Sequence, residues 1–271
     1  MRFIQKENDM KNRYYVEIEQ DGYDEKAYLR VFKFALLLTQ KDRDVKRIVC
    51  YIHTKGNIGY FASLFDDSLI KMLLTGHVMV EPFPVPLTIQ TKSSYSKNKY
   101  FSGNHDLVLA FGMDKEDLEV LDDYDGIEYI VAIPWLKDKT APWIERWNVR
   151  EITGKQYDKN VSEVSDIVKV AMTELSSVIN MSTGISHPSD NNRAKTYIRA
   201  LYKYEPELDA EAVVSYLVTG LGWTSSHAND VGKLITTLNE GRYFRGGEKT
   251  GLQDYYKRWK EKVKSAKNNH P

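Results

Sequence analysis

The chain has 271 residues, of which 42% are apolar, and its 38 lysines and arginines balance its 38 aspartates and glutamates. This length fits one or two domains, and the apolar content is enough for an ordinary core, which excludes wholesale disorder. The zero net charge excludes a chain that is basic throughout, but the charge is unevenly spread. Residues 241–267 hold nine bases and three acids, whereas residues 106–128 hold nine acids and one base.

The single cysteine, Cys50, excludes a disulfide within the chain and a cysteine-based zinc site. Because it lies in an apolar run, we expect it to be buried. The first ten residues are polar and lack the apolar segment of a signal peptide. No stretch approaches about 18 continuous apolar residues. We therefore expect no membrane span and a cytoplasmic location.

Strand-like and helix-like segments alternate over residues 14–153. Apolar runs at 47–53, 107–111 and 129–133 predict three adjacent, buried strands. The alternation predicts a Rossmann-like α/β domain, with an open, mostly parallel sheet and flanking helices. Strands are predicted at 14–19, 46–53, 77–81, 87–91, 106–111, 129–133 and 149–152, helices at 24–39, 60–74, 114–123 and 141–147, and loops at 54–59 and 92–103.

After Gly154 every periodic segment has helical spacing, so we expect an all-helical domain without strands longer than about three residues. Two helix starts in this part each have two candidate caps: Ser189 or Asp190 for one, and Ser225 or Ser226 for the other. Helices are predicted at 161–179, 190–204, 209–218, 226–239 and 252–264. The predicted organisation is a polar N-terminal extension (1–13), an α/β sheet domain (14–154) and an all-helical domain (155–268).

The polar loop at residues 54–59, which follows the predicted strand 46–53, is the first candidate for a ligand site. Ligands of open α/β sheets bind beyond the carboxyl ends of the strands, and a helix start offers backbone N–H groups to an anion. The loop matches neither G-x-x-x-x-G-K-[ST] nor G-x-G-x-x-G, so an ordinary glycine-containing turn is the alternative. Asp114 and Trp135 follow two other strands and should lie at the same edge, although Asp114 is also a natural helix cap and Trp135 can simply pack on a helix. The predicted ligand-binding residues are His53, Lys55, Gly56, Asn57, Gly59, Asp114 and Trp135.

The basic C-terminal segment is the second candidate, as a surface for phosphate or nucleic acid. Two arginines and two aromatic residues precede a basic final helix. The alternative is that this segment is a solvated helix face. The predicted phosphate-binding residues are Arg242, Arg245, Lys249, Lys257 and Arg258.

No catalytic or metal-binding motif is present, and no cofactor is indicated. The favoured function is a sensing or regulatory protein that binds a nucleotide or nucleic acid, with the ligand at the carboxyl ends of the strands. One alternative is an enzyme acting on a nucleotide or phosphorylated substrate, with His53, Lys55 and Asp114 near the reaction centre. The other is a protein-interaction module without a small ligand.

Overall fold

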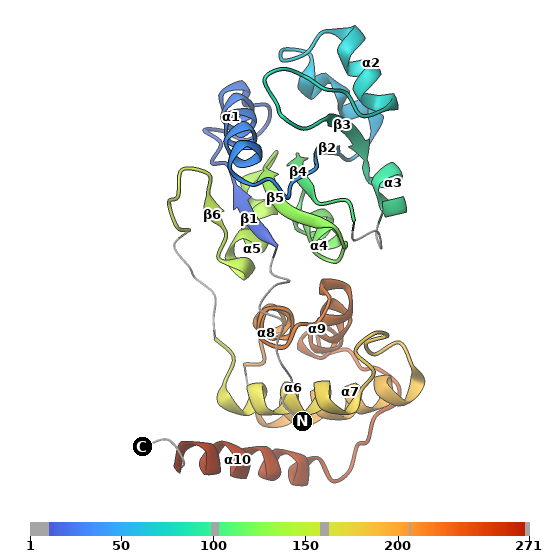
Figure 1. The fold of residues 1–271 in the computed structure, drawn as a ribbon. Helices are drawn as coiled ribbons and strands as arrows, with labels where there is room; N and C mark the ends of the chain where they lie inside the picture. The colour runs from blue at the N-terminus through green and yellow to red at the C-terminus, as the bar shows by residue number, and fades with distance from the viewer. Residues whose placement is uncertain (1–10, 99–102, 158–162, 206, 269–271) are drawn as a thin grey trace. The chain divides into compact units, whose positions relative to one another are not determined.

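The computed structural model describes residues 11–98, 103–157, 163–205 and 207–268 (Figure 1). The chain divides after residue 159 into two compact units, and each is described by itself. The first unit is an α/β unit and the second is helical, which confirms the predicted fold class.

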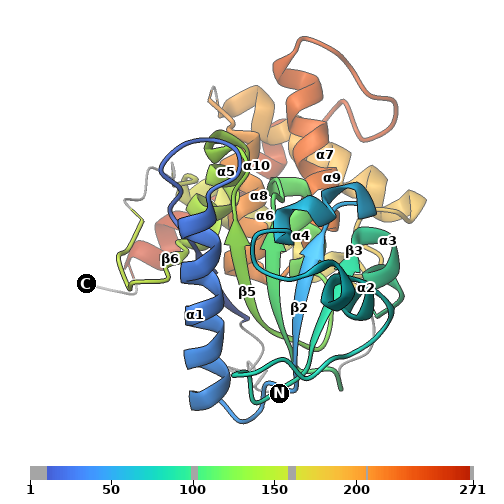
Figure 2. The same ribbon diagram turned by 90° about the horizontal axis from the view of Figure 1, so that it is seen from above.

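The first unit is built on a six-stranded sheet in which all strands run parallel (Figure 2). The strand order is β3-β2-β4-β5-β1-β6, so the three apolar runs predicted to be adjacent are neighbours, and the prediction is confirmed. Their residues are almost entirely buried, including Cys50. The strands are β1 (Asn12–Tyr15), β2 (Arg47–Ile52), β3 (Leu87–Thr91), β4 (Asp106–Phe111), β5 (Ile127–Ile133) and β6 (Arg150–Glu151).

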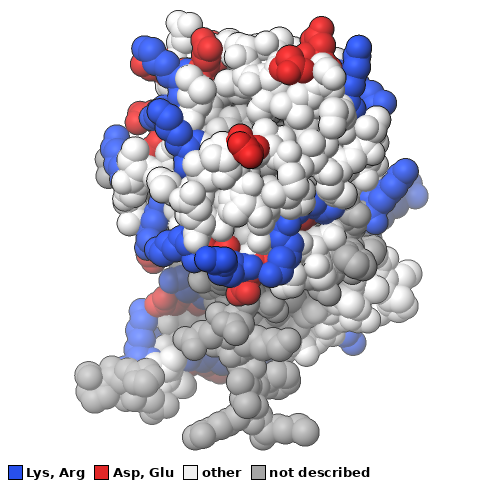
Figure 3. All heavy atoms as spheres, turned by 45° about the horizontal axis from the view of Figure 1, so that its top comes forward, with Lys and Arg blue, Asp and Glu red and all other residues white. Residues whose placement is uncertain are grey.

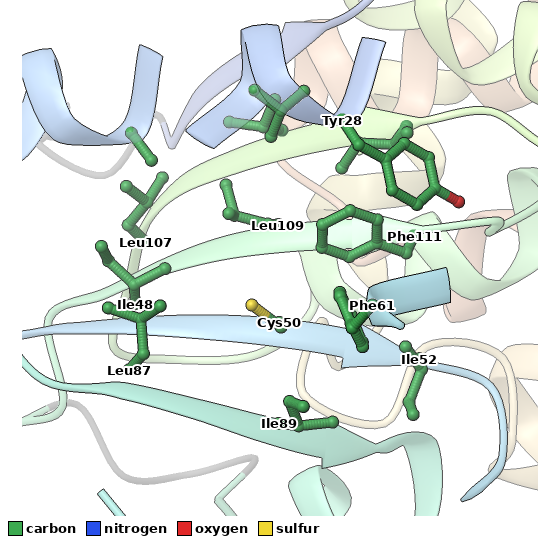
Figure 4. Packing of buried hydrophobic residues seen from close by; sticks show 14 of the residues in the cluster. Tyr28, Ile48, Cys50, Ile52, Phe61, Leu87, Ile89, Leu107, Leu109 and Phe111 are labelled. Atoms are coloured by element: carbon green, nitrogen blue, oxygen red, sulfur yellow. The ribbon is translucent and has the colours of Figure 1, made fainter. Parts of the chain in front are cut away.

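Helices cover both faces of the sheet and bury a separate apolar cluster on each. On one face, α1 (Glu25–Lys41), the 3-10 helix η1 (Lys55–Phe61) and α2 (Asp67–Thr75) pack on alternate strand residues (Figure 4). On the other face, α4 (Lys115–Asp122) and α5 (Lys137–Trp147) do the same. The short α3 (Lys92–Tyr95) and the 3-10 helix η2 (Ser96–Asn98) follow β3 directly. This is the three-layer arrangement that a parallel sheet needs to be buried on both sides.

Two aspartates, Asp24 and Asp114, cap helices of this unit, and Asp114 is a cap predicted from the sequence. The Asp24 side chain accepts a hydrogen bond from the Ala27 N–H and begins α1. The Asp114 side chain accepts one from the Asp117 N–H and begins α4. Each cap satisfies an N–H that the first helical turn would otherwise leave unpaired.

Several predicted elements in this unit are wrong. The predicted loop 54–59 forms most of η1, because the Asn57 side chain accepts hydrogen bonds from the Thr54 N–H and hydroxyl and closes a turn early. The next helix begins at Asp67 and not at Tyr60, since Asp66 caps it. The predicted strand 77–81 contributes only an antiparallel bridge between Val78 and Leu87. Prolines at 82, 84 and 86 prevent a longer ladder there, because proline donates no backbone hydrogen bond.

Two further predictions differ in extent. The predicted strand 14–19 ends as β1 at Tyr15, although the Val16 N–H still donates to the Ala132 carbonyl at 3.1 Å. The predicted loop 92–103 begins with α3 and η2, and Tyr95 is buried rather than exposed. Residues 99–102 of that loop lie outside the described residues.

The second unit contains five helices among its described residues and no strand there, as predicted. Asp209 caps α8 at the predicted start of that helix, but His187 caps α7 and Thr224 caps α9, one or more residues before the predicted caps. The predicted start of α6 at residue 161 lies outside the described residues, and Ser165 caps that helix. The helices are α6 (Asp166–Val178), α7 (Pro188–Tyr204), α8 (Ala210–Leu221), α9 (Ser225–Asn239) and α10 (Leu252–Asn268).

The surface of the first unit has a broad area with few charged side chains (Figure 3). The large apolar side chains exposed on this unit include Leu29 and Leu37 of α1, Met72 of α2, and Met79. Single exposed apolar side chains are ordinary on protein surfaces, so we assign them no function. None of the helices in the described part of the chain combines the length and apolar character needed to cross a membrane.

Candidate functional site

The strand order alone indicates where a ligand site is expected, between β2 and β4. The chain leaves β2 for β3 on one side of the sheet and leaves β4 for β5 on the other side, and β2 and β4 are neighbours. The two connections therefore diverge between these strands. Such a switch point opens a crevice at the carboxyl ends of the strands, where ligands of parallel α/β sheets bind. The residues after Ile52 and after Phe111 border this position.

A polar cluster lies at this switch point around the carboxylate of Asp117, in the first turn of α4. The Asp117 side chain is only 5% exposed. His53, which follows β2, places its Nδ1 3.2 Å from Asp117 Oδ2. Lys92, which follows β3, donates from its ammonium to Asp117 Oδ1. Residues that follow two neighbouring strands therefore converge on one buried carboxylate.

This cluster has groups that can both transfer a proton and hold a charge. The hydrogen bond to Asp117 raises the pKa of the Lys92 ammonium, which keeps it charged. When His53 donates from Nδ1 to Asp117, its Nε2 is left as a proton acceptor. The side chains of His53 and Lys92 are 56% and 43% exposed, so a ligand can reach both from solvent.

An aromatic pair lies at the same edge of the sheet. Tyr60 of η1 and Trp135, which follows β5, are stacked with ring centroids 5.1 Å apart. Gly112, which follows β4, has a left-handed φ of 68°, and a Cβ there would lie 3.3 Å from the Tyr60 hydroxyl oxygen. Asn57 donates to that hydroxyl at 2.9 Å. The segments after β2, β4 and β5 therefore meet, and glycine is needed at the point of contact.

Two buried tyrosine hydroxyls near this edge have no hydrogen-bond partner within the described part of the chain. Tyr28 of α1 packs edge-to-face on Phe111, at 4.9 Å between ring centroids, and its hydroxyl points toward the carboxyl ends of the strands (Figure 4). Tyr51, next to last in β2, is the second. Burial raises the pKa of Tyr51, with smaller contributions from Tyr124 and Asp117, so this hydroxyl remains a donor. An unpaired buried hydroxyl is unfavourable unless something accepts from it.

The structure brings three of the residues predicted from sequence into these two clusters. His53 contacts Asp117, Asp114 caps the helix that carries Asp117, and Trp135 stacks on Tyr60. They lie at one edge of the sheet because the carboxyl ends of parallel strands share an edge.

The other four predicted residues have different environments. Lys55 is exposed at the start of η1, and Asn57 uses its side chain within the turn. Neither Gly56 nor Gly59 has a left-handed φ, and a Cβ on Gly59 would have nothing within 4 Å. Local packing therefore does not require glycine at either position.

Sequence reasoning missed Asp117, Lys92 and Tyr28. Asp117 was detectable, because it is three residues after the predicted cap Asp114 and so lies in the first turn beside the strand end. Lys92 directly follows the strand at 87–91, but because residues 92–103 were predicted to form an exposed loop, Lys92 was not assigned to the edge of the sheet. Nothing in the sequence distinguishes Tyr28 from the other apolar positions of its helix.

A separate pocket of about 470 Å³ lies at the carboxyl end of β1. Its charged groups are largely satisfied by the protein itself. Asp24 accepts from two backbone N–H groups, and Lys137 donates to the Glu19 carbonyl at 3.0 Å. We therefore rank it below the switch point. It is lined by Glu17, Ile18, Glu19, Asp24, Lys26, Arg30 and Lys137.

Within the described residues, no three His, Cys, Asp or Glu side chains form a group that could hold a metal ion.

The five basic residues predicted to bind phosphate do not form one uniform surface. Arg258 of α10 donates to Glu174 of α6, as does Lys262, so it helps attach the final helix. Arg242 pairs with Glu240 but remains 68% exposed. The remaining three, Arg245, Lys249 and Lys257, are exposed.

The fold and these clusters define an α/β unit with a polar cluster and an aromatic pair at the carboxyl ends of a parallel sheet, followed in the chain by a helical unit. Residues 164–260 of the helical unit match a family model described as "Domain of unknown function (DUF1889)". The match runs from just before α6 into α10 and specifies no activity. No curated protein and no solved structure matches the chain.

Proposed function

We propose that the first unit binds a mononucleotide at the switch point between β2 and β4. The observation that carries this proposal is that an aromatic pair, Tyr60 and Trp135, and a polar cluster around Asp117 both lie at the carboxyl-end edge of the sheet. A nucleotide has the matching parts: a planar base that stacks on aromatic rings, and a phosphate that accepts hydrogen bonds from the Lys92 ammonium and from a ring N–H of His53.

The charges of this site predict how the nucleotide is held. The formal charges of Lys55 and Lys92 are cancelled by those of Asp114 and Asp117. Net attraction of an anion is therefore small, and affinity should depend on stacking and on directed hydrogen bonds, including one from the Tyr28 hydroxyl. We expect binding to weaken only slightly when the salt concentration is raised.

Calorimetric titration with AMP, GMP, CMP and UMP at low salt tests the proposal. Trp135→Leu should weaken binding by removing the stack. Lys55→Ala should weaken it by no more than about 1.5–3 kcal/mol, the range for one charge-assisted hydrogen bond. Lys33→Ala, at an exposed position of α1, is the matched control and should change nothing. A wild-type protein that binds none of the four nucleotides would contradict the proposal and favour an interaction module.

A second candidate function is catalysis on a nucleotide or other phosphorylated substrate, favoured by the pairing of His53 with the buried Asp117. In this role His53 Nε2 would take the proton of an attacking water, while Asp117 holds the imidazole in position. His53→Gln should then abolish release of phosphate from nucleoside triphosphates while nucleotide binding persists.

The chain offers a matched control for this experiment at the opposite edge of the sheet. His105, directly before β4, places its Nδ1 2.7 Å from Glu128 Oε1. His105→Gln should leave any turnover unchanged. Turnover that survives His53→Gln would exclude His53 as the base.

A further inference from the structure

The connection between α9 and α10, residues 240–251, is fixed along α7, and we call it the strap (Figure 1). Arg199 of α7 donates to the Phe244 carbonyl at 2.6 Å. Asn192 accepts from the Gly247 N–H at 2.6 Å, and Thr196 accepts from the Glu248 N–H at 2.9 Å. Three side chains of one helix thus hold the backbone of a segment that has no secondary structure of its own.

Close packing adds to these hydrogen bonds. Gly247 has a φ of 74°, and a Cβ there would lie 2.8 Å from Lys195 Cβ, so the backbone lies directly against α7. The Phe244 ring faces the same helix, with the Arg199 guanidinium 4.5 Å from the ring centroid. The strap is therefore held in one conformation, in which Phe244, one of its two aromatic side chains, packs against α7.

The other aromatic side chain, Tyr243, is 86% exposed, although the backbone is held on both sides: the Arg242 N–H donates to the Thr237 carbonyl at 3.0 Å, and Arg199 donates to the Phe244 carbonyl. Arg242 beside it is 68% exposed, and Arg245 and Lys249 are exposed as well. This large aromatic ring is exposed in a strap that carries three cations and two acids, Glu240 and Glu248, and it gains nothing for the folded protein by burial. Because the strap is already ordered, a partner that binds there would lose little conformational entropy in ordering it.

We propose that the strap binds single-stranded nucleic acid, with an unpaired base stacked on Tyr243 and neighbouring phosphates on Arg242, Arg245 and Lys249. The combination of an exposed ring with flanking cations fits this ligand better than an acidic peptide, because every base offers a flat face to stack while a carboxylate does not. Arg242 also pairs with Glu240, but a guanidinium has five N–H donors and can hold a phosphate as well. This surface lies in the helical unit and is independent of the proposed nucleotide site.

Fluorescence anisotropy with the full chain and a labelled 12-nucleotide oligothymidylate tests the proposal. Tyr243→Ala should weaken binding about tenfold or more, from the loss of one stacked base. Tyr243→Phe keeps the ring and should bind like the wild type. Tyr202→Ala is the matched control, since Tyr202 of α7 is also exposed, at 41%, but lies outside the strap. Thermal unfolding of each variant confirms that the fold is retained.

A second arm tests the phosphate contacts. Replacing Arg242, Arg245 and Lys249 together with Gln should weaken binding and flatten its salt dependence. Loss of three phosphate contacts should reduce the slope of log affinity against log salt by about 2, at roughly 0.7 per contact on a single strand. Lys233→Gln, at an exposed position of α9, should leave the slope unchanged.

Three results would overturn the proposal. The first is a wild-type protein that does not bind the oligothymidylate at low salt. The second is a protein that binds a duplex as tightly as the single strand and keeps full affinity in Tyr243→Ala. This result would show that binding is only a general attraction of phosphate, without base stacking. The third is poly-glutamate that displaces the oligonucleotide with comparable affinity, which would assign the strap to an acidic protein partner.

Discussion

Arg47 of β2 and Asp106 of β4 form a two-pronged ion pair across neighbouring strands, with Nε 2.7 Å from Oδ1 and Nη2 2.6 Å from Oδ2. The Asp106 side chain is fully buried, and the Tyr95 hydroxyl donates to it at 2.7 Å. This pair lies at the amino ends of both strands, at the edge of the sheet opposite the candidate site. The two strands that flank the switch point are thus joined at their other end by a buried ion pair.

Asp106→Asn should strongly destabilise the protein, because it leaves the largely buried Arg47 guanidinium, whose side chain is 14% exposed, without a counter-charge. Breaking a buried pair in this way costs about 3–5 kcal/mol. Urea unfolding of the full chain measures the loss. Asp44→Asn, an exposed carboxylate close to the same edge, is the control and should change stability by less than about 0.5 kcal/mol. A loss below about 1 kcal/mol in Asp106→Asn would show that the pair contributes little.

Tyr28→Phe separates a structural role of the buried hydroxyl from a role in binding. The hydroxyl has no partner in the described part of the structure, so its removal should leave stability unchanged or raise it slightly. If a nucleotide accepts a hydrogen bond from it, nucleotide affinity should fall by about 0.5–1.5 kcal/mol in the same variant. Thermal unfolding and calorimetric titration provide the two measurements. A variant that loses stability instead would show that the hydroxyl has a partner in the folded protein.

The sheet was predictable because three of its strands are almost continuous apolar runs, a pattern that a parallel sheet covered on both faces produces directly. The start of α4 was predictable for a local reason, the Asp114 cap. The course of residues 54–66 was not, because a single side chain, Asn57, closes the 3-10 turn, and ordinary helix propensity gives no sign of it. In the candidate site, the topology was enough to place His53 and Trp135 at this edge of the sheet, but the contact of Lys92 with Asp117 depends on the path of the chain after β3, which the sequence pattern does not show.

The attachment of α10 should depend on pH through Glu174 of α6. Partial burial raises the pKa of Glu174, but hydrogen bonds from Lys262, Tyr197 and Arg258 outweigh it and lower the pKa to about 2, against 4.5 for a free carboxyl. Because the pKa is depressed in the folded state, the stabilisation is fully present above pH 4.5 and is lost as the pH falls toward 2.

Glu174→Gln isolates this contribution from those of other carboxylates. At pH 7 the variant should be less stable than the wild type by about 1–3 kcal/mol, since it loses charge-assisted hydrogen bonds. The difference should shrink as the pH is lowered from 4.5 toward 2, because the wild-type carboxylate becomes protonated. Urea unfolding followed by far-ultraviolet circular dichroism at several pH values measures it. A difference that does not change with pH would show that ionisation of Glu174 does not matter.

Gly241 and Gly247 form a matched pair for testing how firmly the strap is held. Both have a left-handed φ, 70° and 74°, so alanine at either position adds about 1–2 kcal/mol of backbone strain. A Cβ on Gly241 has nothing within 4 Å, whereas one on Gly247 would lie 3.0 Å from the Thr196 backbone nitrogen and must displace the strap. That displacement also disrupts the hydrogen bonds that Asn192 and Thr196 accept.

Gly247→Ala should therefore destabilise the helical unit more than Gly241→Ala, by a further 1–3 kcal/mol or so for the two weakened hydrogen bonds. Limited digestion with trypsin gives an independent reading, because Arg242, Arg245 and Lys249 are cleavage points within the strap. Digestion there should be faster in Gly247→Ala than in Gly241→Ala, since cleavage requires the strap to leave α7. The loosened strap should also bind oligothymidylate more weakly, because Tyr243 is no longer held in place. Equal stability and equal digestion of the two variants would mean that the strap is not fixed against α7.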